Sequence, residues 1–436
     1  MAAVARVTAP AFTFENLVRV DATTRLFLVV VNPIFLGISS YVWYRVHTTP
    51  ALRGGMRRFV AWAAVFLAST NALLLANHLL ALWMLLELTA LAATPLVVGH
   101  GHVESRGAAL RYLLFSTVGL GLVALGFGCL SRGMVASGQS STFFVDRLIE
   151  LRPTANAWSR LGLCLVLLGL GTKLGLAPMY SWLPETYDQA PPAVAAMLGA
   201  VQFNAALVVL FRVVQAYRAT SPALVASQLL AMGLVSMLVS TVSIIATRNI
   251  KRLIAYAAIN HAGVIAIGLA VGGSATYGLL LYVLSNAFIK AILFLTTGKI
   301  FAHYKTNDTR VISGLIHDLP YSGVFLMVGT IALLGFPPFG SFLGELLILS
   351  ALVGSGRMLT FAAFCTLITM TFVATGRTVF PMIWGLSKER HEWPRQTLLA
   401  GLPKLTFLLA LVGLGIYIPP SVNTLLQAVA RSLGGP

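Results

Sequence analysis

The chain has 436 residues, of which 58% are hydrophobic and only 10% are charged. A soluble domain carries about 25% charged residues, so most of this chain is expected to lie in lipid. The 30 Lys and Arg residues against 13 Asp and Glu residues give a net charge of +17. These basic residues sit mostly between apolar runs, so they indicate membrane topology, and no nucleic-acid binding is expected.

Residue patterns typical of enzymes and metal sites are missing from the sequence. Cys129, Cys164 and Cys365 lie in apolar stretches without CxxC spacing, so zinc and iron–sulfur sites are not expected. There is no nucleophile elbow, Walker loop, dinucleotide fingerprint or haem ligand pair. We therefore expect no catalytic residue, metal or cofactor in this chain, and any coupled redox chemistry would belong to another subunit.

About twelve apolar segments approach the roughly 20 residues that a membrane span requires. They lie near 25–43, 57–76, 79–98, 108–131, 160–177, 192–216, 224–247, 252–271, 276–302, 321–353, 357–384 and 402–418. Helices are the expected form, because unpaired strand edges cannot face hydrocarbon. The sequence predicts an all-α integral membrane protein with an N-terminal segment (1–24), one transmembrane domain (25–418) and a C-terminal tail (419–436).

Lysine and arginine residues in the loops indicate the orientation of these segments. The side that receives the loop after the first segment has more Lys and Arg residues in its loops than the other side, and we call it the basic side. Its residues are Arg45, Arg53, Arg57, Arg58, Arg106, Arg248, Lys251, Arg252, Lys305, Arg310, Lys388, Arg390 and Arg395. Cytoplasmic loops carry the excess of Lys and Arg, so the basic side is predicted to be cytoplasmic and both termini to face the other way.

Two segments are interrupted by proline, which removes a backbone donor and breaks a helix. The fifth reads GLGTKLGLAPMYSWLPETYDQAPP, with breaks predicted at Pro178 and Pro184, and the tenth reads LLGFPPFGSFLGELLIL, with breaks at Pro337 and Pro338. The breaks lie five segments apart, and an odd repeat inverts the second copy relative to the first. This spacing predicts two inverted five-helix repeats, about 79–216 and 224–384, an arrangement that indicates a transport path.

Buried ionisable residues are the candidates for that path, because a charge at the bilayer centre costs about 2.5–3.5 kcal/mol on insertion scales. The candidates are Glu87, Lys173, His261, Lys290 and Glu345. Each also has a structural interpretation: a carboxylate bonded to a neighbouring helix, a lysine that reaches the interface, or a satisfied core histidine. A Lys or His that gains and loses a carboxylate partner can take up and release a proton.

Four ordered motifs carry a resemblance that runs from about Val18 to Tyr417. They are GTKLGLAPMYSWLPETYDQAPPAVAAML, NIKRLIAYAAINHAGVIAIG, SNAFIKAILFL and GFPPFGSFLGELLIL. Together they resemble the proton-conducting antiporter-like subunits of respiratory complex I and of membrane-bound hydrogenases of the formate hydrogenlyase type. The same fold serves in multisubunit sodium/proton antiporters.

The resemblance implies a role for each candidate. Glu87 matches the glutamate that the family pairs with its first lysine, and Lys173 matches that lysine. His261 falls on the central hydrophilic axis, Lys290 matches the lysine of the following helix, and Glu345 matches the charge of the second broken helix. In the family these residues form a protonatable chain along the membrane midplane, reached by two inverted half-channels.

Three departures accompany the resemblance. The chain begins at what looks like the third of the fourteen helices usual in the family, and it stops near Pro436 without a long lateral helix. Asn204 stands where many complex I members place a bridging lysine, so it would support the path only through hydrogen bonds or water.

The resulting expectation is a proton-translocating subunit of a complex I-like or hydrogenase-like assembly in a bacterial or archaeal plasma membrane. Its expected partners are other membrane subunits, the lipid bilayer and, in one variant, a soluble subunit. Glu87 and Lys173 would form the input switch, Lys290 and His261 the relay, and Glu345 the exit. The alternatives are a cation/proton antiporter subunit, a proton-driven module for inorganic-carbon uptake, and a scaffold that has lost transport.

Overall fold

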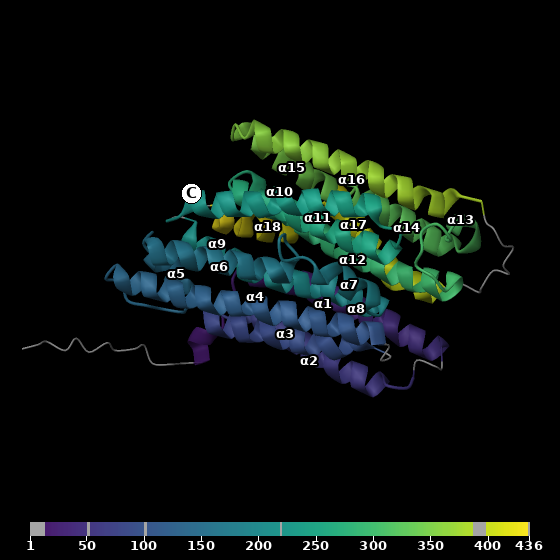
Figure 1. Cartoon of the computed structure of the whole chain (residues 1–436), viewed down its shortest axis with the longest axis horizontal. Helices are drawn as coiled ribbons and strands as arrows, with labels where there is room; N and C mark the ends of the chain where they lie inside the picture. Colours follow the sequence, from purple (N-terminus) through teal and green to yellow (C-terminus); the bar gives the residue numbers. More distant parts are fainter. Residues whose placement is uncertain (1–13, 50–52, 100–102, 219, 387–397, 435–436) are drawn as a thin grey trace, which may run out of the picture.

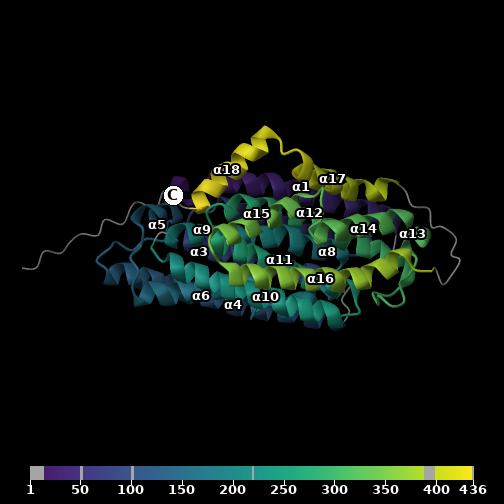
Figure 2. The ribbon, with the colours of Figure 1, turned by 90° about the horizontal axis from the view of Figure 1, so that it is seen from above.

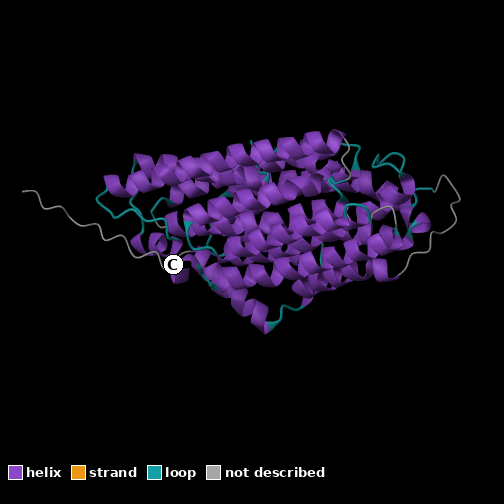
Figure 3. Cartoon of the chain, turned by 90° about the horizontal axis from the view of Figure 1, so that it is seen from below, coloured by secondary structure: helices purple, strands orange, loops and turns teal. Residues whose placement is uncertain are grey.

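The computed structural model describes residues 14–49, 53–99, 103–218, 220–386 and 398–434. Across these residues nearly all of the backbone is helical, and the only extended pairing consists of isolated bridges (Figure 3). The prediction of an all-α membrane protein is confirmed. Residues 1–13 and the basic-side residues Lys388, Arg390 and Arg395 lie outside the described residues.

The described helices follow the apolar segments in chain order. The first half contains η1 (Phe14–Leu17), α1 (Ala22–Thr48), α2 (Met56–Leu75), α3 (Leu79–Val98), α4 (Val103–Ala136), α5 (Val145–Leu151), α6 (Ala157–Leu174), α7 (Trp182–Gln189), α8 (Pro192–Ala196), the π-helix η3 (Met197–Gln202) and α9 (Phe203–Tyr217). The second half contains α10 (Pro222–Ala246), α11 (Ile250–Val271), α12 (Ala275–Tyr304), α13 (Leu315–Asp318), α14 (Pro320–Leu333), α15 (Gly340–Gly354), α16 (Met358–Trp384), α17 (Leu398–Ile416) and α18 (Pro420–Gly434).

Ten spans among the described residues are long and apolar enough to cross a membrane, with α8, η3 and α9 forming one of them. The pair α17–α18, bent by 70°, gives up to one more. Helices α14 and α15 are apolar but shorter, as expected for the two arms of an interrupted segment. The predicted C-terminal tail contains α18, which folds back over α1 and α12 (Figure 2).

The helices lie roughly parallel, with those of the first half on one flank and those of the second on the other (Figure 1). The span 192–217 is fully buried, and α11 and α12 are almost as deep, so these helices form the centre of the bundle. Small residues let neighbouring backbones approach. A Cβ on Gly126 of α4 would lie 2.8 Å from the Gly162 carbonyl oxygen of α6, the close packing that membrane helices use in place of a hydrophobic driving force.

Polar caps hold the helix ends at the two surfaces. Asp21 accepts a hydrogen bond from the Thr24 amide (2.8 Å) at the start of α1, and Asn156 forms a capping box with Ser159 at the start of α6. Asn249 accepts from the amides at the start of α11. Each cap satisfies amides that have no partner within their helix.

Candidate functional site

The two predicted breaks both form near the middle of the bundle. In the first, α6 ends one residue after Lys173, Pro178 lies in the following turn, and α7 begins at Trp182. In the second, Pro337 and Pro338 lie between α14 and α15. Pro184 differs from its prediction: it lies in the first turn of α7, where a proline removes no intrahelical hydrogen bond.

Side chains satisfy backbone groups that the breaks release. The Trp182 indole donates to the Thr172 carbonyl oxygen (2.8 Å), and the Ala177 amide donates to the Ser236 hydroxyl (2.8 Å). At the second break, Ser341 donates to the Ala332 carbonyl oxygen (2.8 Å). An interrupted helix is tolerated at membrane depth only where protein or water provides such partners. The breaks are therefore built into the packed interior.

Glu87 lies at the edge of the bundle on α3 and is only partly buried. One carboxylate oxygen accepts from Thr117 on α4 (2.8 Å), and the other has no hydrogen-bond partner among the described residues. Lys173 interacts electrostatically with Glu87, although the described ion pairs within 4.0 Å do not include this pair. Glu87 and Lys173, the expected input switch, thus interact across a gap and do not form a contact ion pair.

Lys173 is buried, and the described residues offer its ammonium no hydrogen-bond partner. The nitrogen lies 5.5 Å from the centre of the Tyr112 ring. A buried ammonium without a hydrogen bond is costly, so a water molecule or a closer approach of the Glu87 carboxylate would stabilise the charge of Lys173.

A polar link that sequence reasoning missed begins at the other end of Tyr112. Its hydroxyl donates to Gln202 Oε1 (3.0 Å), and Gln202 Nε2 lies 2.8 Å from the same hydroxyl and 3.1 Å from Thr89 Oγ1. Gln202 is the last residue of η3 and is buried. The sequence feature that indicates this link is the single amide side chain, Gln202, in the otherwise apolar run AAMLGAVQF.

Asn204, two residues further on, turns away from this link. Its Nδ2 donates to the Ala200 carbonyl oxygen of its own helix (2.6 Å), and its Oδ1 is buried without a partner among the described residues. Neither of its hydrogen-bonding groups reaches Lys173 or Lys290. Gln202, rather than Asn204, is the amide that bonds to Tyr112, whose ring lies beside the Lys173 ammonium.

Lys290 of α12 lies beside η3 and is 1% exposed. Its ammonium stands 3.8 Å from the centre of the Phe203 ring, a cation–π contact. Its stem packs on Gly199, where an added Cβ would lie 3.5 Å from Lys290 Cδ. The π-helix and the residue after it therefore contact Lys290 through Gly199 and Phe203, and the Tyr112 link through Gln202.

The second half continues from Lys290 to Glu345 through buried aromatic and imidazole groups. His261 interacts electrostatically with Lys290 and lies beside Asn286. The His261 ring stacks on Tyr282 with the centroids 5.4 Å apart, and the Tyr282 hydroxyl interacts with the Glu345 carboxylate. A cavity of about 10 Å³ lined by His261, Tyr282 and Glu345 joins them, close to the least volume that holds one water molecule, about 10–15 Å³.

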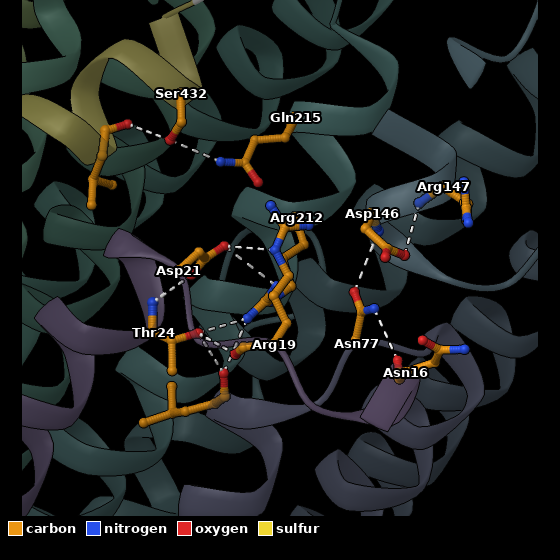
Figure 4. Close-up of polar contacts among 12 residues, drawn as sticks. Asn16, Arg19, Asp21, Thr24, Asn77, Asp146, Arg147, Arg212, Gln215 and Ser432 are labelled. Atoms are coloured by element: carbon orange, nitrogen blue, oxygen red, sulfur yellow. Dashed lines mark hydrogen bonds and ion pairs between the residues drawn. The ribbon is translucent and has the colours of Figure 1, made fainter. Parts of the chain in front are cut away.

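Other buried charges serve the framework. Arg212 of α9 is 1% exposed; it donates to Thr24 (2.9 Å) and to the Leu74 carbonyl oxygen (3.0 Å) and lies 3.7 Å from Asp21, which also pairs with Arg19 (Figure 4). This cluster ties α1, α2 and α9 together at the side opposite the basic side. The sequence did not predict this cluster, because an arginine near the end of an apolar segment is usually interpreted as a charge in the following loop.

Lys251, interpreted from the sequence mainly as a topology residue, is also buried. Its ammonium donates to the carbonyl oxygens of Asp188 (2.5 Å) and Ala190 (2.8 Å), and Arg252 pairs with the Asp188 carboxylate (2.9 Å). These contacts fix the end of α7 against the start of α11. They place the first break relative to the central helices.

No group of three or more His, Cys, Asp and Glu residues in the described part of the chain could hold a metal ion. What the interior offers is a row of separate protonatable groups, from Glu87 and Lys173 across η3 to Lys290, His261 and Glu345. Such a row can pass protons from group to group, but it provides no nucleophile or metal. Fold and site together define an antiporter-like, multi-pass membrane protein with two broken helices.

The comparisons with known proteins agree with this class. The profile of the family described as "NADH:quinone oxidoreductase/Mrp antiporter, TM" matches residues 76–371, more than half of the chain. The chain belongs to this family, so the resemblance inferred from its motifs is confirmed.

Relatives and a solved structure extend the match to most of the chain. The hydrogenase-4 component F homolog of Methylacidiphilum infernorum is 27% identical over 92% of this chain and 86% of its own length. The NADH-quinone oxidoreductase subunit N 2 of Chloroherpeton thalassium is 30% identical over 67% of this chain and 58% of its own length. A chain of an archaeal membrane-bound sulfane sulfur reductase has the same fold, with a TM-score of 0.84 and 21% identity, over 95% of this chain and 83% of that one.

Proposed function

We propose that this chain translocates protons across the membrane, as an antiporter-like subunit of a complex related to complex I or membrane-bound hydrogenase. The single observation that carries the proposal is the row of buried charges beside both helix breaks. Ionisable residues in spanning segments are functional candidates by default because they are expensive to keep there. The redox chemistry would take place in partner subunits.

The first half acts as the input switch in this proposal. Glu87 lies near enough to Lys173 to stabilise its positive charge, yet the two groups are not locked in a contact ion pair. A shift of the Glu87 carboxylate would therefore change the proton affinity of Lys173 without first breaking a strong buried bond. A contact pair at this position would resist switching.

A neighbouring subunit could act on Glu87 directly. Residues around it on the outer faces of α3 and α4 are apolar and exposed, among them Met84 (61%), Leu114 (64%) and Val118 (56%). Apolar faces of this kind meet either lipid or another membrane subunit. We place the redox-coupled partner against this face, where its charges would reach the partly buried carboxylate.

The π-helix η3 is the proposed gate between the halves. Gln202 contacts Tyr112, whereas Gly199 and Phe203 contact Lys290, so this turn touches the residues of both halves. π-Helical turns frequently occur at functional sites, and their irregular hydrogen bonding leaves room for local rearrangement. Beyond the gate, Lys290, His261 and Tyr282 relay the proton to Glu345, the proposed exit.

Matching helix pairings support two inverted repeats of five segments, with the first repeat beginning at α2, before the predicted start near residue 79. Helix α2 packs on α3 as α10 packs on α11, and α4 contacts both arms of the first broken helix as α12 contacts both arms of the second. Each pairing recurs at a spacing of five segments. We further propose that the basic side faces the cytoplasm of a bacterial or archaeal cell and that both termini face outward.

The test is proton transport by the purified complex in liposomes, followed with a pH-sensitive dye. We expect Glu87→Gln, Lys173→Ala, Lys290→Ala and Glu345→Gln each to abolish most of the proton flux while the complex still assembles. Lys305→Asn is the matched control: it removes a lysine at the end of α12 whose left-handed backbone (φ 57°) Asn tolerates. Normal pumping by both Lys173→Ala and Glu87→Gln would eliminate the mechanism.

A cation/proton antiporter is the second candidate, favoured by the antiporters that the matching family includes. The two functions differ in what drives the flux. Proton movement that starts only when an electron donor is added favours the redox-coupled subunit. Proton movement that a sodium gradient drives without any donor favours antiport.

A further inference from the structure

A large surface hollow lies away from the proton path, between α10, α16 and the loop after α12. Its volume is about 920 Å³. Along α16 it extends from Thr369 to Pro381, a distance of about 18 Å at 1.5 Å per residue. It begins at the basic-side ends of the helices and runs toward the middle of the membrane.

The lining of the hollow changes character along this length. The basic-side end carries the exposed guanidinium groups of Arg248, Arg310 and Arg377. Deeper in, along α16, the surface is apolar and open, with Met370 44% and Val373 57% exposed. A cationic end at the membrane surface followed by an apolar groove matches a molecule with an anionic head and a hydrocarbon tail.

The charges at the surface end are not balanced by the residues described there. Arg310 is already engaged, because its Nε and Nη2 donate to the two Asp308 carboxylate oxygens (3.1 and 2.7 Å). Arg248 lies near the same carboxylate, and the Arg377 guanidinium has no ion pair or hydrogen bond to the described residues. Among the described residues, the lining thus carries three guanidinium groups, of which two lie near the Asp308 carboxylate, and this excess of positive charge favours a bound anion.

We propose that this hollow binds an anionic phospholipid, with the phosphate between Arg248 and Arg377 and an acyl chain along α16. Arginine recognises phosphate through several donors in a fixed plane, and basic pockets between spanning helices bind anionic headgroups. A free anion would use only the surface end of the hollow. The exposed apolar surface of α16 favours a lipid over a free anion. This inference does not rest on the proposed proton path.

The test uses the full-length chain with the subunits that co-purify with it, in detergent, and counts bound lipid by native mass spectrometry. The probes are dioctanoyl phosphatidylglycerol, dioctanoyl phosphatidylcholine and glycerol phosphate. We expect phosphatidylglycerol to bind at least tenfold more tightly than phosphatidylcholine, and glycerol phosphate not to compete. The double variant Arg248→Gln/Arg377→Gln should weaken phosphatidylglycerol binding about thirtyfold, from about 1 kcal/mol for each juxtamembrane arginine.

Two further variants keep the test decisive. Arg132→Gln/Arg160→Gln removes the same charge from exposed positions on the opposite side and should leave binding unchanged. Arg377→Gln alone removes no described contact, so the fold should persist while binding weakens about fivefold.

Three results would overturn the proposal. Equal binding of the two lipids would exclude headgroup recognition, and competition by glycerol phosphate would indicate a site for free anions. A co-purifying subunit that crosslinks to position 377 while no lipid is bound would show that protein covers the hollow.

Discussion

Replacing Gln202 by Leu tests whether the halves are connected through η3. The change removes a buried amide whose oxygen and nitrogen both contact the Tyr112 hydroxyl, at 3.0 and 2.8 Å. Thr89 loses less, because its hydroxyl also donates to the Leu86 carbonyl oxygen (2.7 Å). The main cost is therefore one buried hydroxyl left without a partner.

The size of the effect follows from these contacts. An unsatisfied buried polar group costs about 1–3 kcal/mol, and hydrogen bonds between membrane helices average about 0.6 kcal/mol with a maximum near 1.7. We expect Gln202→Leu to lower the free energy of unfolding by about 1.5 kcal/mol. The loss of the polar link should slow proton transfer about tenfold, which is a barrier increase of about 1.4 kcal/mol.

A double-mutant cycle with Tyr112→Phe separates this effect from general damage. Phe removes the hydroxyl that Gln202→Leu would strand, so the double variant should be more stable than the sum of the single changes by about 1 kcal/mol. Stability is measured by thermal unfolding in detergent and transport by dye quenching in liposomes. Strictly additive effects, or full transport in Gln202→Leu, would refute the reasoning.

Three further predictions concern the second break, the Arg212 cluster and a basic-side loop. Gly335→Ala should abolish proton flux with the complex still assembled, because φ is +68° there and the new Cβ would overlap the Glu345 carboxylate; normal flux would show that the carboxylate can move freely. Arg212→Met should cost about 2–3 kcal/mol in thermal unfolding, below the 3–5 kcal/mol of a fully buried pair, because its carboxylate partner is partly exposed; an unchanged melting temperature would contradict it. Hydrogen bonds from Arg310 lower the pKa of Asp308 from 3.8 to about 2. The Asp308 carboxylate therefore stabilises the loop after α12 above pH 3.8, and this stabilisation is lost as the pH falls toward 2. Hydrogen-exchange protection of the loop that stays constant over this range would contradict the prediction.

The helix breaks and the buried charges could be predicted because they depend on residue type alone. A proline pair inside an apolar run interrupts a helix wherever the run packs, and a lysine such as Lys290 in the middle of a segment has no route to water. The overall class of the fold follows from the same apolar runs. These inferences need no knowledge of which helices are neighbours.

The direction in which each side chain points could not be predicted in the same way. The span 192–217 is buried on all sides, so its apolar pattern has no face that distinguishes Gln202 from Asn204. The separation of Glu87 from Lys173 depends on how α3 and α6 pack around α4, which spacing along the chain does not determine. The burial of Arg212 likewise depends on the partners that α1 and α2 bring to it.

The π-helical turn also sets the rotational register of everything that follows it in α9. Each residue added to or removed from a helix turns the next part by about 100°. A π-helical turn is wider and holds one extra residue, so deleting one residue within 197–202 with a return to α-helical geometry would keep Arg212 facing Thr24 and Asp21. The same deletion within 203–211, which is already α-helical, would rotate Arg212 away from them. The wide turn at the centre of the bundle is therefore the part of this span where one residue could be lost without moving Arg212 away from its partners.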